Sequence, residues 1–181
     1  MIAIIDYDAG NVKSVQNALK KLGFEAEITS DIETIENADK VIFPGVGEAS
    51  SAMKKLQERG LDAVIPNLKQ PVLGICLGMQ LMCNASEEGN TKALGIFDCE
   101  VKLFPNSDIV PHMGWNNVSE MKGKLLENIS ETDNFYFVHS YYAEICENTS
   151  SVCDYITPFS ATLEKDNFYA AQFHPEKSGD T

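Results

Sequence analysis

The sequence predicts an α/β fold with a central, mostly parallel sheet flanked by helices and an antiparallel extension. Three observations predict it. Short apolar, β-branched segments alternate with amphipathic segments up to about residue 84, which is typical of parallel strands joined by right-handed crossovers. From about residue 98 to 175, strands and turns replace the helices. Of the 181 residues, 44% are hydrophobic and 23% charged, which suits one domain with a full core.

In the first half, strands and helices are expected to alternate. Val12, Val15 and Leu19 recur at helical spacing, Asn11 is a plausible N-cap, and Gly23 closes that helix. The strands are expected at 2–6, 24–28, 40–43 and 72–76, and the helices at 12–22, 49–59 and 77–84.

In the second half, alternating apolar residues between turns predict strands. They are expected at 100–104, 135–145, 152–155, 161–163 and 168–173. This antiparallel extension should return to the sheet and deliver His174. The chain shows no repeats, linkers or low-complexity segments.

Residues 71–80 (Pro-Val-Leu-Gly-Ile-Cys-Leu-Gly-Met-Gln) carry the strongest chemical signal. A short apolar strand runs into Cys76, which has glycines two residues before and two residues after it, and a helix follows. This is the cysteine form of a nucleophile elbow, where residues without side chains let the backbone pass close by. The N-terminus of the following helix would favour the thiolate. The alternative, a buried core cysteine, does not explain the paired glycines.

His174 is the expected base for this nucleophile. Pro175 favours an extended conformation before it, and residues two apart in an extended chain point to the same side. His174 and Glu176 should therefore project together, and the carboxylate can hold the imidazole tautomer whose other nitrogen faces Cys76. A cysteine, a distant histidine and a carboxylate form the constellation for acyl transfer. Alone, His-Pro-Glu would indicate a surface turn.

Residues 74–80 and 173–177 (Phe-His-Pro-Glu-Lys) resemble the class I (triad) glutamine amidotransferase family. Segments 43–47, 112–116 and 136–141 resemble, within that family, the glutaminase subunits of imidazole glycerol phosphate synthases, and the match spans nearly the whole chain. The resemblance implies a flavodoxin-like fold and hydrolysis of glutamine to glutamate and ammonia without a cofactor. Cys76, His174 and Glu176 would be the catalytic residues.

The tetrahedral intermediates of this reaction need preorganised N–H donors. One should be the backbone N–H of Leu77, directly after the nucleophile. The other should come from the loop Gly45-Val46-Gly47, whose glycines let a peptide present either its N–H or its C=O to the site. A plain strand-to-helix turn is the alternative for this loop.

The resemblance further implies contacts with the substrate. Glu88 would offer its carboxylate to the α-ammonium group of glutamine, and the backbone around Ser140 and Tyr141 would bind the α-carboxylate. Gln80 should also lie near the substrate. Gln80 could instead be a solvated helix residue, and Glu88 could belong to an acidic surface run with its neighbour Glu87.

Ammonia released into neutral water is mostly protonated, so the glutaminase should work docked on a partner that uses ammonia. The resemblance implies a heterodimer with a (β/α)8-barrel cyclase that makes imidazole glycerol phosphate and an aminoimidazole carboxamide ribotide in histidine biosynthesis. Trp115 and Lys177 would then face that subunit, although a core aromatic in a Gly-Trp-Asn turn is the default for Trp115. His112 and His139 are expected to be structural or interface residues.

Charge and cysteine content argue against other classes of protein. The net charge of −13, from 27 acidic and 14 basic residues, would repel nucleic-acid phosphates. No stretch approaches the roughly 18 apolar residues of a membrane span, and the N-terminus lacks the basic region of a signal peptide. The five cysteines have no metal-ligand spacing, which predicts no metal site and a reducing compartment, the cytoplasm.

Residues 1–181 are expected to form a single glutamine amidotransferase domain that lacks the closing C-terminal helix of the family. Three rival functions share parts of the pattern. They are a stand-alone α/β cysteine hydrolase, a glutaminase of another amidation pathway, and a non-enzymatic binding module. Partner-dependent glutaminase activity would exclude the first and third, and a product assay with the cyclase would exclude the second.

Overall fold

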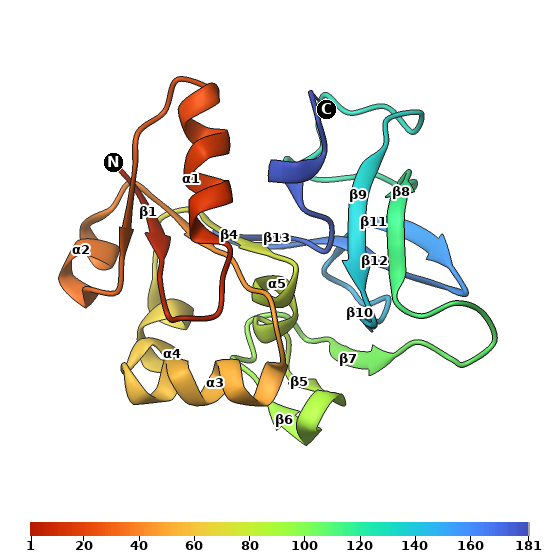
Figure 1. The fold of residues 1–181 in the computed structure, drawn as a ribbon, viewed down its shortest axis with the longest axis horizontal. Coiled ribbons are helices and arrows are strands. Elements are labelled where there is room, and N and C mark those ends of the chain that lie inside the picture. The colour runs from red at the N-terminus through yellow and green to blue at the C-terminus, as the bar shows by residue number, and fades with distance from the viewer. Residues whose placement is uncertain (181) are drawn as a thin grey trace.

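The structure is a computed structural model that describes residues 1–180. Its centre is a seven-stranded sheet with the order β11-β12-β13-β4-β3-β1-β2 (Figure 1). Five strands are parallel, and β12 and β11 continue the sheet antiparallel. The bounds are β1 (Ile2–Ile5), β2 (Ala26–Thr29), β3 (Lys40–Phe43), β4 (Val72–Ile75), β11 (Thr149–Tyr155), β12 (Thr157–Lys165) and β13 (Phe168–Ala171). The predicted fold class is confirmed.

Five α-helices connect these strands within residues 1–180. They are α1 (Val12–Lys21), α2 (Ile32–Asn37), α3 (Ala49–Glu58), α4 (Leu61–Val64) and α5 (Leu77–Leu81). The helices α2 and α4 were not predicted from the sequence, although Asp31 caps α2 by accepting the N–H of Thr34 at 2.9 Å. The helix predicted at 77–84 ends early because Asn84 donates its N–H to the carbonyl of Cys99, at 2.9 Å, and leaves the helix.

Two smaller sheets form the second half of the molecule. One has the order β10-β7-β5-β6, and β8 and β9 form the other as an antiparallel ribbon. Their bounds are β5 (Ala85–Ser86), β6 (Thr91–Lys92), β7 (Glu100–Leu103), β8 (His112–Asn116), β9 (Phe135–His139) and β10 (Tyr141–Ala143).

Three local predictions for these regions are wrong. The single strand at 135–145 breaks at Ser140, because β9 pairs with β8 whereas β10 pairs with β7. The segment around Trp115 is a strand and not a turn. The strand that delivers His174, β13, belongs to the main sheet and lies parallel to β4, so it is antiparallel only to β12.

The core lies on both faces of the main sheet. A large apolar cluster joins the sheet to α3, α4 and α5, and a smaller one, with Ile4 and Ile42, lies under α1. Beside α1, a groove of about 250 Å³ is lined by apolar side chains including Leu19, Phe24 and Leu73. Within residues 1–180, no helix has the length and apolar character to cross a membrane.

Candidate active site

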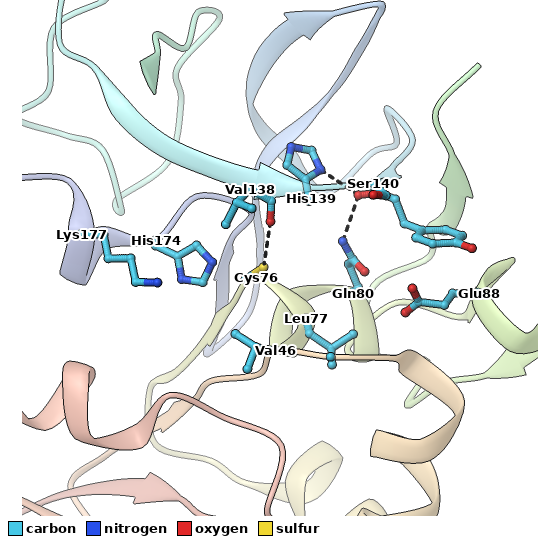
Figure 2. Close-up of a pocket in the computed structure, with 12 residues that line it drawn as sticks. Val46, Cys76, Leu77, Gln80, Glu88, Val138, His139, Ser140, His174 and Lys177 are labelled. Atoms are coloured by element: carbon cyan, nitrogen blue, oxygen red, sulfur yellow. Dashed lines mark hydrogen bonds between the residues drawn. The ribbon is translucent and has the colours of Figure 1, made fainter. Parts of the chain in front are cut away.

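A cavity of about 280 Å³ opens at the carboxyl ends of the parallel strands, the edge where α/β folds bind ligands. Its lining includes most of the residues proposed from the sequence. These are Val46, Gly47, Cys76, Leu77, Gln80, Glu88, Ser140, Tyr141, His174 and Lys177. In the view of Figure 2, Cys76 lies between His174 and Lys177 on one side and Gln80 and Glu88 on the other.

Cys76 sits at a sharp corner between β4 and α5. Its φ of 54° and ψ of −111° are strained for a residue with a side chain, at a cost of about 1–3 kcal/mol. The flanking glycines are required by space. A Cβ on Gly78 would lie 1.9 Å from the carbonyl oxygen of Phe43, and one on Gly74 would lie 2.4 Å from the sulfur of Met82. The close backbone approach predicted for the elbow is therefore present.

His174 and Glu176 lie together in a buried contact. His174 lies two residues after the end of β13, and β13 pairs with β4, the strand that Cys76 directly follows. Its Nδ1 is 2.7 Å from Oε1 of Glu176, and both side chains are buried. Its Nε2 is buried with no hydrogen-bond partner in the described structure. The imidazole is thus held on one side and free on the other.

The charges of this group favour an imidazolium. Burial lowers the pKa of His174, but the interactions with Cys76 and Glu176 outweigh it and raise the pKa to about 9. An imidazolium beside the sulfur stabilises a thiolate. Cys76, His174 and Glu176 can therefore act as nucleophile, acid–base and orienting carboxylate.

The expected oxyanion donors are engaged within the protein. The N–H of Leu77 donates to the carbonyl of Gly45 at 3.2 Å, and the N–H of Val46 donates to the carbonyl of Ala9 at 2.7 Å. The hydroxyl of Tyr7 holds the carbonyl of Pro44 at 2.8 Å. In this conformation, the loop Gly45-Val46-Gly47 presents a carbonyl and not an N–H to the elbow.

Gln80 and Glu88 line the same cavity, and Glu88 lies farther from Cys76 than Gln80 does (Figure 2). Gln80 is buried and donates to the carbonyl of Tyr141 at 3.0 Å, so it is not a solvated helix residue. Glu88 accepts the N–H of Ala49 at 2.7 Å. Burial raises the pKa of Glu88, and this hydrogen bond offsets part of the effect. Ser140 occupies the break between β9 and β10.

The remaining histidines support the wall of the cavity. His112 Nδ1 lies 3.0 Å from His139 Nε2, and His139 Nδ1 lies 2.7 Å from the carbonyl of Tyr141. Burial lowers the pKa of His112 to about 4 and that of His139 to about 3. Both are neutral at physiological pH, in keeping with the structural role expected for them.

The sequence did not single out Tyr7, Val138 or Gln172, yet all three contact this site. Tyr7 fixes the loop, the carbonyl of Val138 accepts the thiol of Cys76 at 3.9 Å, and Gln172 donates to the sulfur at 3.6 Å. Only Gln172 carried a usable signal, as a polar residue directly after an apolar strand and two residues before His174. Trp115, in contrast, is 58% exposed and lies outside the core and the cavity lining.

The fold and the site together suit an α/β enzyme that carries out acyl transfer with a cysteine, a histidine and a carboxylate. Within residues 1–180, no cluster of histidine, cysteine or acidic side chains is arranged to hold a metal ion. The profile of a family described as "Glutamine amidotransferase class-I" matches residues 3–181. The chain therefore belongs to the class-I glutamine amidotransferases, which are enzymes.

Relatives and solved structures agree with this assignment. "Imidazole glycerol phosphate synthase subunit HisH" of Bacteroides thetaiotaomicron is 57% identical and covers 99% of this chain and 93% of its own length. The Haemophilus influenzae protein of the same name is 48% identical, and the match covers 98% of this chain and 90% of that protein. A crystal structure of a glutamine amidotransferase matches in fold with a TM-score of 0.75 at 19% identity. The match covers 99% of this chain and 93% of that chain.

Proposed function

We propose that this chain is the glutaminase subunit of an imidazole glycerol phosphate synthase. It would hydrolyse glutamine and pass the ammonia to a (β/α)8-barrel cyclase subunit in histidine biosynthesis. The observation that carries the proposal is the buried Cys76-His174-Glu176 arrangement, in a chain 48–59% identical over nearly its whole length to relatives named as that subunit. The free state of all five cysteines suits a reducing compartment such as the cytoplasm.

The geometry of the site supports the following chemistry. The thiolate of Cys76 attacks the side-chain amide carbon of glutamine, and the imidazolium of His174 donates a proton to the departing ammonia. His174 then activates a water molecule, which hydrolyses the γ-glutamyl thioester. Glu176 keeps the imidazole oriented in both steps.

The ends of the cavity suit the two ends of the substrate. The carboxylate of Glu88, which retains one oxygen beyond its bond to Ala49, would take the α-ammonium group. Backbone at Ser140 and Tyr141 would take the α-carboxylate. Gln80 holds the carbonyl of Tyr141 and so positions that backbone.

The loop Gly45-Val46-Gly47 supports a switched enzyme. In its present conformation, the N–H of Leu77 is bonded to the carbonyl of Gly45 and the N–H of Val46 to the carbonyl of Ala9. Neither N–H is then available to bind the oxyanion. Loss of one oxyanion donor costs about 10²–10³ in rate. A peptide rotation in this loop that frees the N–H of Leu77 would restore the oxyanion donor. Partner binding can favour the rotated state only through contacts that differ between the two states.

A surface beside the cavity suits the partner. In the β8–β9 ribbon, Met113 pairs with Val138 and Trp115 pairs with Tyr136, so the four side chains share one face. Val138 lines the cavity, while Met113 and Trp115 are 64% and 58% exposed. This apolar face therefore continues to the cavity mouth, where Lys177 also lies, and ammonia would be released next to the partner.

The test is the glutaminase rate of the chain alone, with the cyclase, and with the cyclase plus its ribotide substrate. We expect a nearly idle chain that the loaded partner activates by about 10²-fold or more, the size of one oxyanion donor. Formation of imidazole glycerol phosphate from glutamine identifies the pathway. Equal rates in all three mixtures would indicate a stand-alone hydrolase, and activation without that product would indicate another amidation pathway.

A further inference from the structure

Gln172 is a fully buried polar residue that touches the reacting sulfur. It is 0% exposed and lies between the end of β13 and His174. Its amide nitrogen Nε2 is 3.6 Å from Sγ of Cys76. Its amide oxygen Oε1 accepts from Nε2 of Gln80 at 2.9 Å. Gln80 on α5 and Gln172 after β13 thus form a series of hydrogen bonds that ends at the sulfur of Cys76.

The direction of this series is fixed by a backbone carbonyl. The carbonyl of Tyr141 can only accept, so the end of Gln80 that lies 3.0 Å from it must be the NH₂ group. That same NH₂ group faces Gln172, whose nearer atom must then be the oxygen. The NH₂ group of Gln172 is consequently the part directed at Cys76. A donor, and not an acceptor, is aimed at the sulfur.

We propose that Gln172 stabilises the thiolate of Cys76 through this N–H···S hydrogen bond, with Gln80 and the carbonyl of Tyr141 holding its amide in the donating orientation. The inference rests on the proposed role of Cys76 as nucleophile. A hydrogen bond to a charged acceptor is stronger than one to a neutral acceptor, so the bond favours the ionised sulfur over the thiol. Gln172 thereby acts directly on the reacting sulfur, and Gln80 is a positioning residue that acts through it.

Other groups face Cys76 and act on the same ionisation. The imidazole of His174 favours the thiolate. The buried hydroxyl of Tyr7 stays neutral, because burial and the charge of Cys76 both raise its pKa. Lys177 lines the same cavity. None of these groups changes when Gln172 is replaced, so a variant at position 172 isolates the amide.

The experiment measures the pH dependence of Cys76 alkylation by iodoacetamide in the full chain, without glutamine or partner. In Gln172→Met, which keeps the size but lacks the donor, we expect the midpoint to rise by about one pH unit. Gln172→Glu should raise it at least as far, since an acidic group replaces the donor. Gln80→Met should give a smaller rise, because it only frees the amide to rotate.

A control separates this role from loss of a side-chain amide in general. The half-buried side chain of Gln70 also donates to a backbone carbonyl, that of Ile35 at 2.9 Å, at the amino end of β4 and away from the cavity. Gln70→Met should leave the alkylation midpoint unchanged. If the midpoints of Gln172→Met and Gln172→Glu equal the control value, the inference is overturned. If Gln172→Met does not fold, Gln172→Glu and Gln80→Met decide.

This readout is independent of the proposed function. A wild-type chain that hydrolyses no glutamine with its cyclase would refute the glutaminase assignment, yet the alkylation midpoints would still decide the role of Gln172. Conversely, unchanged midpoints in an active glutaminase would refute only the role of Gln172.

Discussion

At the residue scale, the five cysteines differ in their surroundings. Cys76 is next to an imidazole and opens to the cavity. The pKa of the thiol of Cys153 is raised to about 12, chiefly by burial. The contact with Cys99, and then burial, raises the pKa of Cys146. For Cys99, the contact with Cys146 lowers the pKa, but Cys83 and burial outweigh it and raise the pKa. Raised pKa values keep these thiols protonated and unreactive at neutral pH.

We therefore predict that a glutamine-mimicking electrophile labels Cys76 stoichiometrically and spares the other cysteines. Peptide mass spectrometry of the labelled chain checks this. Cys76→Ala should abolish glutamine-dependent turnover, whereas its complex with the cyclase should still use added ammonium salt. Labelling mainly at Cys83 or Cys99 would contradict the assignment of the nucleophile.

His174 and Glu176 should differ in the size of their effect. His174→Ala removes the group that transfers protons, and we expect glutamine turnover to fall by on the order of 10⁴-fold or more. Glu176→Gln keeps a polar partner for Nδ1 and should cost less. Steady-state rates of the activated complex test both variants. Near-normal turnover in His174→Ala would show that another group is the base.

At the element scale, the elbow depends on the contact between α5 and the end of β3. A Cβ on Gly78 would meet the carbonyl oxygen of Phe43, so Gly78→Ala must displace backbone. We predict a loss of about 3 kcal/mol or more in the free energy of unfolding. Urea denaturation provides the measurement.

Gly23 is the matched control for that substitution. Its φ is +86°, but a Cβ there would have no neighbour within 4 Å. Gly23→Ala should therefore cost only the left-handed backbone penalty of about 1 kcal/mol. Because Gly78 lies within α5 and has no positive φ, equal losses for the two variants would contradict the requirement for close approach at position 78.

The β8–β9 ribbon contains two buried neutral histidines, which makes stability depend on pH. His112 and His139 have lowered pKa values of about 4 and about 3 in the folded chain, against about 6.5 when unfolded. At pH values between the folded and the unfolded pKa, the unfolded chain binds more protons than the folded chain does. The free energy of unfolding should thus fall as the pH drops below 6.5, by up to about 1.4 kcal/mol per pH unit for each histidine.

Urea titrations between pH 7.5 and pH 5 check this slope. His112→Gln keeps a donor for His139 and removes one titrating group, so it should reduce the slope by about half. His174 affects stability at higher pH. Its raised pKa gives a stabilisation of the folded chain that is complete below about pH 6.5 and is lost as the pH rises towards 9. An unchanged slope in His112→Gln would show that other groups dominate.

At the scale of the whole molecule, the exposed apolar face of the β8–β9 ribbon is the expected docking surface. Replacing Trp115 by alanine should remove a large aromatic anchor, at a cost of about 2 kcal/mol, or roughly 30-fold in the Kd for the cyclase. Isothermal titration calorimetry with the purified cyclase measures this.

Leu22→Ser is the matched control, because Leu22 is 71% exposed but lies in the groove beside α1, near the amino ends of β1, β3 and β4. It should leave the affinity unchanged. A loss of affinity in Leu22→Ser but not in Trp115→Ala would move the docking surface to the groove.

Much of this molecule could be predicted from local sequence. The alternation of short apolar segments with amphipathic segments predicted the α/β class. Most of the strands and helices predicted in the first half lie within two residues of their predicted bounds. The chemistry at Cys76 and at His174-Pro175-Glu176 was also readable, because each motif specifies its own backbone within a few residues.

Only the tertiary structure decided how these motifs meet. The break at Ser140, the exposure of Trp115 and the bond from Leu77 to Gly45 depend on which strands and loops become neighbours. The contact between Gln80 and Gln172 joins residues 92 positions apart, and its direction follows from a carbonyl on a third element. Local patterns fix backbone conformation, whereas side-chain partners across the sheet follow from strand order and register, which the sequence of one strand does not contain.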